Sequence, residues 1–241
     1  MRLAICLYGL VGNLVGKSGY NSLGRESALE LGFDHWSEFF SRDHEVDFFI
    51  HSWEGDLSER IIDLYQPKEY LFEDQKKFEI PKYVIGSEKR CQNVYSRWYS
   101  QMMSNKLLDR QIDSGLYDYV VSSRFDIGWK KKIDFESLNK DILYYPGGIS
   151  NARKILDYWF VANVSNMHRF CKLFDSLDEY NMPGKKDEVC SLNKKLGISP
   201  HRLAKFHLKK LGMQHEPLLW QNHWIDQADS DFPILRNIYF S

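Results

Sequence analysis

The sequence predicts an α/β fold with a mostly parallel central sheet and a helical section at its carboxyl end. Over the first two thirds of the chain, short runs of β-forming residues alternate with segments whose apolar residues recur at helical spacing. A long helical pattern at 88–113 directly precedes the most apolar of these runs, at 117–129. The last third has mainly helical periodicity. Because no repeat, low-complexity tract or linker interrupts the 241 residues, we expect a single domain over 1–241.

The individual elements follow from composition and spacing. Strands are expected where Val, Ile, Phe and Tyr cluster, at 3–10, 46–53, 70–72, 117–129, 142–146 and 155–162. Helices are expected where apolar residues return every three or four positions, at 27–40, 57–65, 88–113, 165–177, 187–196 and 203–211.

The boundaries rest on capping and breaking residues. Ser87 is placed to cap the longest helix, and Ser165 or Asn166 to cap the fourth. The pair Ser199-Pro200 is a helix start signal. Residues 146–148, Pro-Gly-Gly, are expected to stop the strand that begins at 142, and the chain beyond Gln214 is expected to be irregular.

Composition excludes several classes of protein. The net charge is −1 and the pI is near 6.7, so the chain lacks the basic footprint of a nucleic-acid binder. No apolar run approaches the roughly 20 residues of a membrane span. The four cysteines lie far apart, at positions 6, 91, 171 and 190, which argues against a zinc site. Cys6, Cys91 and Cys171 each fall within apolar patterns, as buried free thiols do. We therefore expect a cytoplasmic protein without a membrane span.

The run 117–129 ends in charged residues. Side chains alternate along a strand, so Arg124 and Asp126 are expected on one face. The carboxyl ends of central strands are where α/β sheets bind ligands. An ion pair that closes the strand end is an equally good interpretation of the same spacing.

A glycine-rich segment follows the first predicted strand and begins at Gly9. Such a loop often brings backbone N–H groups to phosphates. Gly16-Lys17-Ser18 resembles the end of a P-loop, but that pattern requires glycine at position 11, where Val11 stands. A loop near a ligand and a plain surface loop remain the alternatives.

Three further polar or aromatic positions are candidates. His51 and Trp53 share one face at the carboxyl end of the predicted strand 46–53, where a structural histidine and a ligand contact are about equally expected. Arg97 falls on the long helix, and spacing alone favours solvated surface for it.

Several stretches together resemble a group of bacterial and viral glycosyltransferases of the GT-A type, which serve polysaccharide synthesis. They are I-H-S-W at 50–53, Y-S-R-W-Y-S at 95–100, S-R-F-D at 123–126 and D-Y-W-F-V-A at 157–162. The resemblance covers the first two thirds best. It implies a Rossmann-like GT-A sandwich in which 1–164 bind a nucleotide-sugar donor and 165–241 form a helical or irregular section on the side of the glycan acceptor.

The resemblance also assigns roles. The D-x-D motif of such enzymes holds Mn²⁺ or Mg²⁺ on the donor diphosphate, and here its positions are Arg124, Phe125 and Asp126. Asp126 would be the metal ligand, and Arg124 would contact the diphosphate and stabilise the departing charge. Asp157 would by position take the proton of the acceptor. The donor contacts would be Tyr8, Gly9, Lys17, His51, Trp53, Arg97 and Arg124.

Two alternatives to a transferase remain. The replaced first acid of D-x-D and the 15% aromatic content also suit a non-catalytic carbohydrate-binding protein or a lapsed glycosyltransferase. A P-loop-like kinase or sulfotransferase that uses Lys17 is a third interpretation, which predicts a helix beginning near Ser18; Gly19 argues against that helix.

Overall fold

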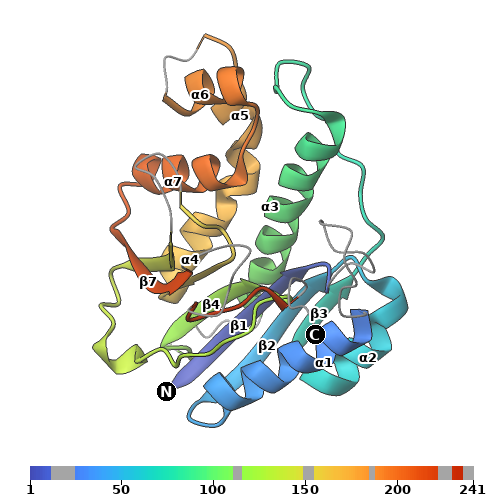
Figure 1. Ribbon diagram of the computed structural model, residues 1–241, viewed down its shortest axis with the longest axis vertical. Helices are drawn as coiled ribbons and strands as arrows, with labels where there is room; N and C mark the ends of the chain where they lie inside the picture. The colour runs from blue at the N-terminus through green and yellow to red at the C-terminus, as the bar shows by residue number, and fades with distance from the viewer. Residues whose placement is uncertain (12–24, 111–115, 149–154, 185–187, 222–229, 236–241) are drawn as a thin grey trace.

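A computed structural model describes residues 1–11, 25–110, 116–148, 155–184, 188–221 and 230–235. The described residues form a seven-stranded sheet in the order β3-β2-β1-β4-β6-β5-β7 (Figure 1). Every strand is parallel to its neighbours except β6, which is antiparallel to both β4 and β5. The α/β fold with a mostly parallel sheet is therefore confirmed. The strands are β1 Arg2–Gly9, β2 Glu45–Ser52, β3 Glu69–Phe72, β4 Tyr119–Arg124, β5 Leu143–Gly148, β6 Trp159–Ala162 and β7 His215–Gln221.

Helices cover both faces of the sheet, as Figure 1 shows. Alternate residues of β1 point to opposite sides, so that Ile5 packs toward α1 and α2 while Cys6 packs toward α3, α4 and α7. α5 and α6 lie farther from the sheet. The helices are α1 Arg25–Trp36, α2 Ser58–Tyr65, α3 Glu88–Asp109, α4 Val164–Cys171, α5 Leu177–Asn181, α6 Glu188–Leu196 and α7 Pro200–Lys210.

Most of the predicted caps are correct, and one is displaced. Ser87 caps α3 by accepting a hydrogen bond from the Arg90 N–H at 3.3 Å. α4 begins earlier than expected, because Asn163 is its cap and accepts from the Asn166 N–H at 2.7 Å. The helix expected over 165–177 is interrupted by a 3-10 turn, Lys172–Ser176.

Three strand predictions need correction. β4 stops at Arg124, and a turn follows, so the alternation expected through Asp126 does not extend that far. β6 begins only at Trp159, which leaves Asp157 in the segment before the strand. β5 continues through Pro146 and the two glycines, because its register with β7 shifts between Pro146 and Gly147 and the irregularity accommodates a residue without an N–H.

The prediction that the chain is irregular after Gln214 is wrong for residues 215–221. These residues form β7, which pairs in parallel with β5 at the edge of the sheet. The carboxyl-terminal section therefore contributes a strand to the sheet that the first 164 residues build. Within the described residues, no helix combines the length and the apolar character needed to cross a membrane.

The described cysteines bear out the prediction of buried free thiols. Cys6, Cys91 and Cys171 are all unpaired and buried.

Candidate functional site

Three side chains form a row at the carboxyl ends of adjacent strands. Tyr8 of β1 is in register with His51 of β2 on one side and with Arg124 of β4 on the other. Neighbours in register share a face of a parallel sheet, and this face is the one that α3 covers. The strand order reverses between β1 and β4, which is where open α/β sheets bind ligands.

Helix α3 presents polar side chains to this row from above. Arg97 and Gln101 are one helical turn apart, and Arg97 Nη1 donates to Gln101 Oε1 at 2.8 Å. Nη2 of the same guanidinium donates to the Tyr8 hydroxyl at 2.9 Å. Gln101 in turn donates to Ser122 Oγ of β4 at 3.0 Å. The contacts fix the guanidinium of Arg97 over β1 and exclude the solvated-surface interpretation for this residue.

Asp157 is a buried carboxylate between two basic side chains. Its Oδ2 lies 2.5 Å from Arg97 Nε, and its Oδ1 lies 2.9 Å from His201 Nδ1. Burial by itself would raise the pKa of Asp157, but His201 and Arg97 outweigh it and hold that pKa well below its usual range. A carboxylate stabilised so strongly in its charged form is a weak proton acceptor.

Arg124 and Asp126 form the ion pair that the sequence allowed as an alternative to a ligand site. Arg124 Nε donates to Asp126 Oδ1 at 2.8 Å, and Nη2 donates to Oδ2. The guanidinium also lies 5.3 Å from the ring centre of Tyr158. Burial opposes the charge of Arg124, but the Asp126 carboxylate overcomes it and raises the pKa of Arg124. Both groups are thus charged, and the guanidinium has a fixed plane.

The expected metal does not suit the donor atoms seen here. Both oxygens of Asp126 are held by Arg124, and the carboxylate is buried. Among the described residues, no three His, Cys, Asp or Glu side chains gather into a set that would hold a metal ion. The described donors therefore do not fit Mn²⁺ or Mg²⁺, and the chemistry proposed below uses guanidinium groups instead.

His51 belongs to a hydrogen-bonded chain. Its Nε2 lies 2.9 Å from Glu73 Oε1, its Nδ1 lies 2.6 Å from Ser100 Oγ, and the Gly9 N–H donates to that same oxygen at 2.8 Å. Burial lowers the pKa of His51 despite the nearby Glu73, so the ring is neutral near pH 7. The Glu73 carboxylate then accepts a hydrogen bond from the Nε2–H of His51, which leaves Nδ1 to accept from the Ser100 hydroxyl. This chain of hydrogen bonds holds Gly9 at the end of β1, where its φ of 93° suits glycine.

Trp53 packs beside this chain. Its ring stacks on Tyr99 with centroids 5.6 Å apart and meets His51 edge-on at 4.7 Å. Trp53 is buried, so its present contacts are with protein side chains rather than with a ligand.

The structure gathers most of the predicted site at one edge of the sheet. Lys17 lies outside the described residues. The other predicted residues lie at the carboxyl ends of β1, β2 and β4 or against them: Tyr8, Gly9, His51, Trp53, Arg97, Arg124, Asp126 and Asp157.

Sequence reasoning missed Ser100, Glu73 and His201. Ser100 follows Arg97 by three residues, so helical spacing placed both on one face and was a usable signal. Glu73 directly follows the short strand β3, which pairs with β2, and its place at a strand end was a weaker signal that it lies near the site. His201 comes from α7, far along the chain from Asp157, and no spacing connects the two.

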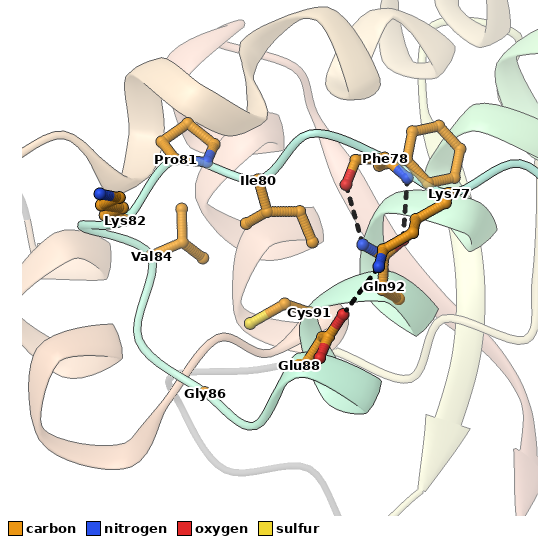
Figure 2. Close-up of a pocket in the computed structure, with 10 residues that line it drawn as sticks. All are labelled: Lys77, Phe78, Ile80, Pro81, Lys82, Val84, Gly86, Glu88, Cys91 and Gln92. Atoms are coloured by element: carbon orange, nitrogen blue, oxygen red, sulfur yellow. Dashed lines mark hydrogen bonds and ion pairs between the residues drawn. The ribbon is translucent and has the colours of Figure 1, made fainter.

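A separate cavity lies beneath the segment that leads into α3 (Figure 2). Its volume is about 320 Å³, and on one side of it Gln92 accepts a hydrogen bond from the Phe78 N–H at 2.9 Å and donates one to the Phe78 carbonyl at 2.8 Å. Lys77 and Glu88 close one side as an ion pair at 3.4 Å. Burial raises the pKa of the Cys91 thiol there, so it is protonated and unreactive. The cavity lies toward the amino end of α3, away from the row.

No family model matches the sequence, and no curated protein matches it. Among solved structures, the chain is similar to a "putative nucleotide-diphospho-sugar transferase" from Desulfovibrio desulfuricans G20, with 12% sequence identity and a TM-score of 0.45. That match covers 92% of this chain and 80% of the other.

Proposed function

We propose that this protein is a glycosyltransferase that moves a sugar from a nucleotide-sugar donor to a glycan or other hydroxyl acceptor. The observation that supports it is the row of His51, Tyr8 and Arg124 at the strand-order reversal of the sheet, beneath Arg97 of α3. The resemblance of the I-H-S-W and S-R-F-D stretches to GT-A enzymes favours the same donor class.

In this proposal Arg124 receives the donor diphosphate. Asp126 occupies Nε and Nη2 of the guanidinium, and Nη1 has no acceptor among the described residues. Negative charge grows on the nucleoside diphosphate as it departs, and a cation already fixed in place stabilises that charge without reorganisation. Arg97 supplies a second positive charge nearby, and the site needs no metal for this step.

The remaining predicted residues are proposed to line the donor side. The His51 chain fixes Gly9, and with it the point where the glycine-rich segment leaves β1. Tyr8 and Trp53 support the walls of the site, and Lys17 follows in that segment. We propose 1–164 as the donor-binding part of one domain and 165–241 as the acceptor-side part.

Trp220 is the proposed acceptor contact. It is half exposed, at 51%, on β7, whose carboxyl end lies at the same edge of the sheet as those of β1 and β4. Leu219, with φ 55°, is an extra residue in β7, and this bulge turns the Trp220 ring onto Gly147, where a Cβ would come within 2.8 Å of it. An exposed indole on a fixed support suits stacking against a sugar ring.

A lapsed transferase or a carbohydrate-binding protein is the second candidate. The observation in its favour is that Asp126 and Asp157, the acids expected to act in catalysis, are both held in ion pairs. Such a protein would bind a nucleotide sugar or glycan and leave it unchanged.

Thermal shift with UDP- and GDP-sugars tests the donor site, followed by chromatography for released nucleoside diphosphate. Binding at about 100 times the dissociation constant adds about 2.7 kcal/mol to the free energy of unfolding. Arg124→Gln combined with Asp126→Asn removes both charges but keeps a polar pair, and we expect it to lose the shift. Arg60→Gln, at an exposed pair with Glu30, is the control and should keep it. No shift with any donor would refute the proposal, and a shift without turnover would favour the second candidate.

A further inference from the structure

A histidine outside the predicted site lies beside it, with one ring nitrogen close to a carboxylate and the other without a partner among the described residues. His201 is the second residue of α7, and its buried Nδ1 lies 2.9 Å from Asp157 Oδ1. The side chain is 29% exposed, and Nε2 has no partner among the described residues. This arrangement differs from that of His51, which is fully buried and bonded through both nitrogens.

We propose that His201 is the general base that takes the proton of the acceptor hydroxyl, and that Asp157 positions it. The inference rests on the proposed function and assigns its base to a residue other than Asp157. His201 Nδ1 lies close to the ionised Asp157 without an aligned hydrogen bond, and the charge of the carboxylate favours the tautomer with the proton on Nδ1. The lone pair of Nε2 is thereby directed away from Asp157.

The other acids and bases of the site are less suited to this role. Asp157 is held in its charged form by Arg97 and His201, and Asp126 has both oxygens bonded by Arg124. Glu73 is bonded to His51 and paired with Lys76. His201, in contrast, has a partly exposed imidazole, and histidine is the side chain most often used as a general base.

The position of His201 relative to Arg124 also suits a direct displacement. The ring of Tyr158 lies near both groups, 5.3 Å from the Arg124 guanidinium carbon and 6.3 Å from the His201 ring centre. The guanidinium carbon and the imidazole ring centre are therefore less than 12 Å apart. A donor sugar placed over Tyr158 would have its leaving group near the Arg124 guanidinium, and the acceptor hydroxyl would lie near the His201 imidazole.

In the proposed step the acceptor oxygen forms a bond to the anomeric carbon of the donor sugar. The bond from that carbon to the phosphate oxygen breaks, and its electron pair goes to the nucleoside diphosphate. The hydroxyl proton passes to Nε2 of His201 and is released to water afterwards. The charges that face the imidazole come from Asp157 beside it, Tyr158 on the same segment, Arg97 on α3 and Arg124 on β4.

The decisive variant is His201→Asn, whose amide nitrogen can still face Asp157 while no base remains. With a nucleotide sugar that the wild type binds and consumes, we expect unchanged thermal shift by that donor and a fall in kcat of about 10²–10⁴-fold. The acidic limb of the wild-type pH–rate profile, where the rate rises as the base loses its proton, should disappear. His168→Asn is a matched control, because His168 Nδ1 also lies 2.9 Å from a carboxylate, that of Asp109, but on α4 and near the far end of α3.

A second readout does not depend on turnover. Long-range proton–nitrogen NMR of the histidine rings should show His201 protonated on Nδ1 in the wild type, and Asp157→Asn should shift that tautomer balance. If the wild type turns over a donor and His201→Asn keeps its rate, or if His201 carries its proton on Nε2, the base assignment is refuted and the proposed function stands. If the wild type neither binds nor consumes any nucleotide sugar, both proposals are refuted.

Discussion

The substitution Ser100→Ala tests whether the chain from Glu73 through His51 to Gly9 holds the end of β1 in place. The hydroxyl of Ser100 is fully buried, accepts from the Gly9 N–H at 2.8 Å and lies 2.6 Å from His51 Nδ1. Alanine removes that oxygen and leaves both the amide and the ring nitrogen without their partner.

The expected cost follows from these two orphaned groups. A buried polar group that loses its hydrogen bond costs about 1–3 kcal/mol, so the two groups orphaned by Ser100→Ala should lower the free energy of unfolding by about 2–6 kcal/mol. That is a large share of the roughly 5–15 kcal/mol by which a domain is stable. Because Gly9 begins the glycine-rich segment, donor affinity should fall as well.

Ser104→Ala is the matched control. Ser104 is also fully buried on α3, but its hydroxyl donates only to the Gln101 carbonyl of the same helix, at 2.9 Å. That carbonyl keeps its helical N–H, so the control should change stability by less than about 1 kcal/mol. Urea denaturation followed by circular dichroism measures both variants. Equal losses of stability in the two would refute the role given to the chain.

Three further outcomes follow from the structure. Burial lowers the pKa of His207 to about 4, whereas a histidine in the unfolded chain takes up its proton near pH 6.5. The free energy of unfolding should therefore fall by about 3 kcal/mol as the pH drops from 6.5 to 4. In His207→Gln, the urea midpoints measured across that pH range should vary less. Arg97→Met should cost about 3–5 kcal/mol in urea denaturation, because the buried Asp157 loses the guanidinium that lies 2.5 Å from its Oδ2, and adding Asp157→Asn should restore part of it; a loss below 1 kcal/mol would contradict the buried ion pair. Trp220→Ala should leave the melting temperature and donor binding unchanged but raise the acceptor KM about fivefold, and an unaltered KM would remove Trp220 from the acceptor site.

The fold was accessible from sequence because its strongest signals are local. Strand β1 and helix α3 each have a pattern long enough to outweigh chance, and alternation of strands with helices predicts a parallel sheet. β7 was missed because Pro217 and Glu216 interrupt its apolar pattern, and only pairing with β5 makes the segment a strand. Pro146 led to the opposite error, because it predicted the end of a strand that continues in the structure. The bulge that tolerates this proline depends on pairing with β7, which is distant in sequence.

The candidate site was only partly accessible, because its contacts join segments far apart in the chain. Tyr8, His51 and Arg124 were found at strand ends, and a parallel sheet brings such ends together whatever the register. His201 was not found, because its meeting with Asp157 depends on how α7 docks against the segment before β6. A histidine with one carboxylate contact has no signature in sequence.

The two interpretations of the Arg124–Asp126 spacing, ion pair and ligand site, are compatible in this structure. Asp126 holds the guanidinium in one plane through two hydrogen bonds, and Tyr158 flanks it. A side chain fixed in this way loses little entropy when an anion arrives, whereas an arginine free in solvent loses more. In the proposed function Asp126 is therefore a support for the Arg124 cation and not a metal ligand. On that proposal, the ion pair prepares the guanidinium to receive a diphosphate.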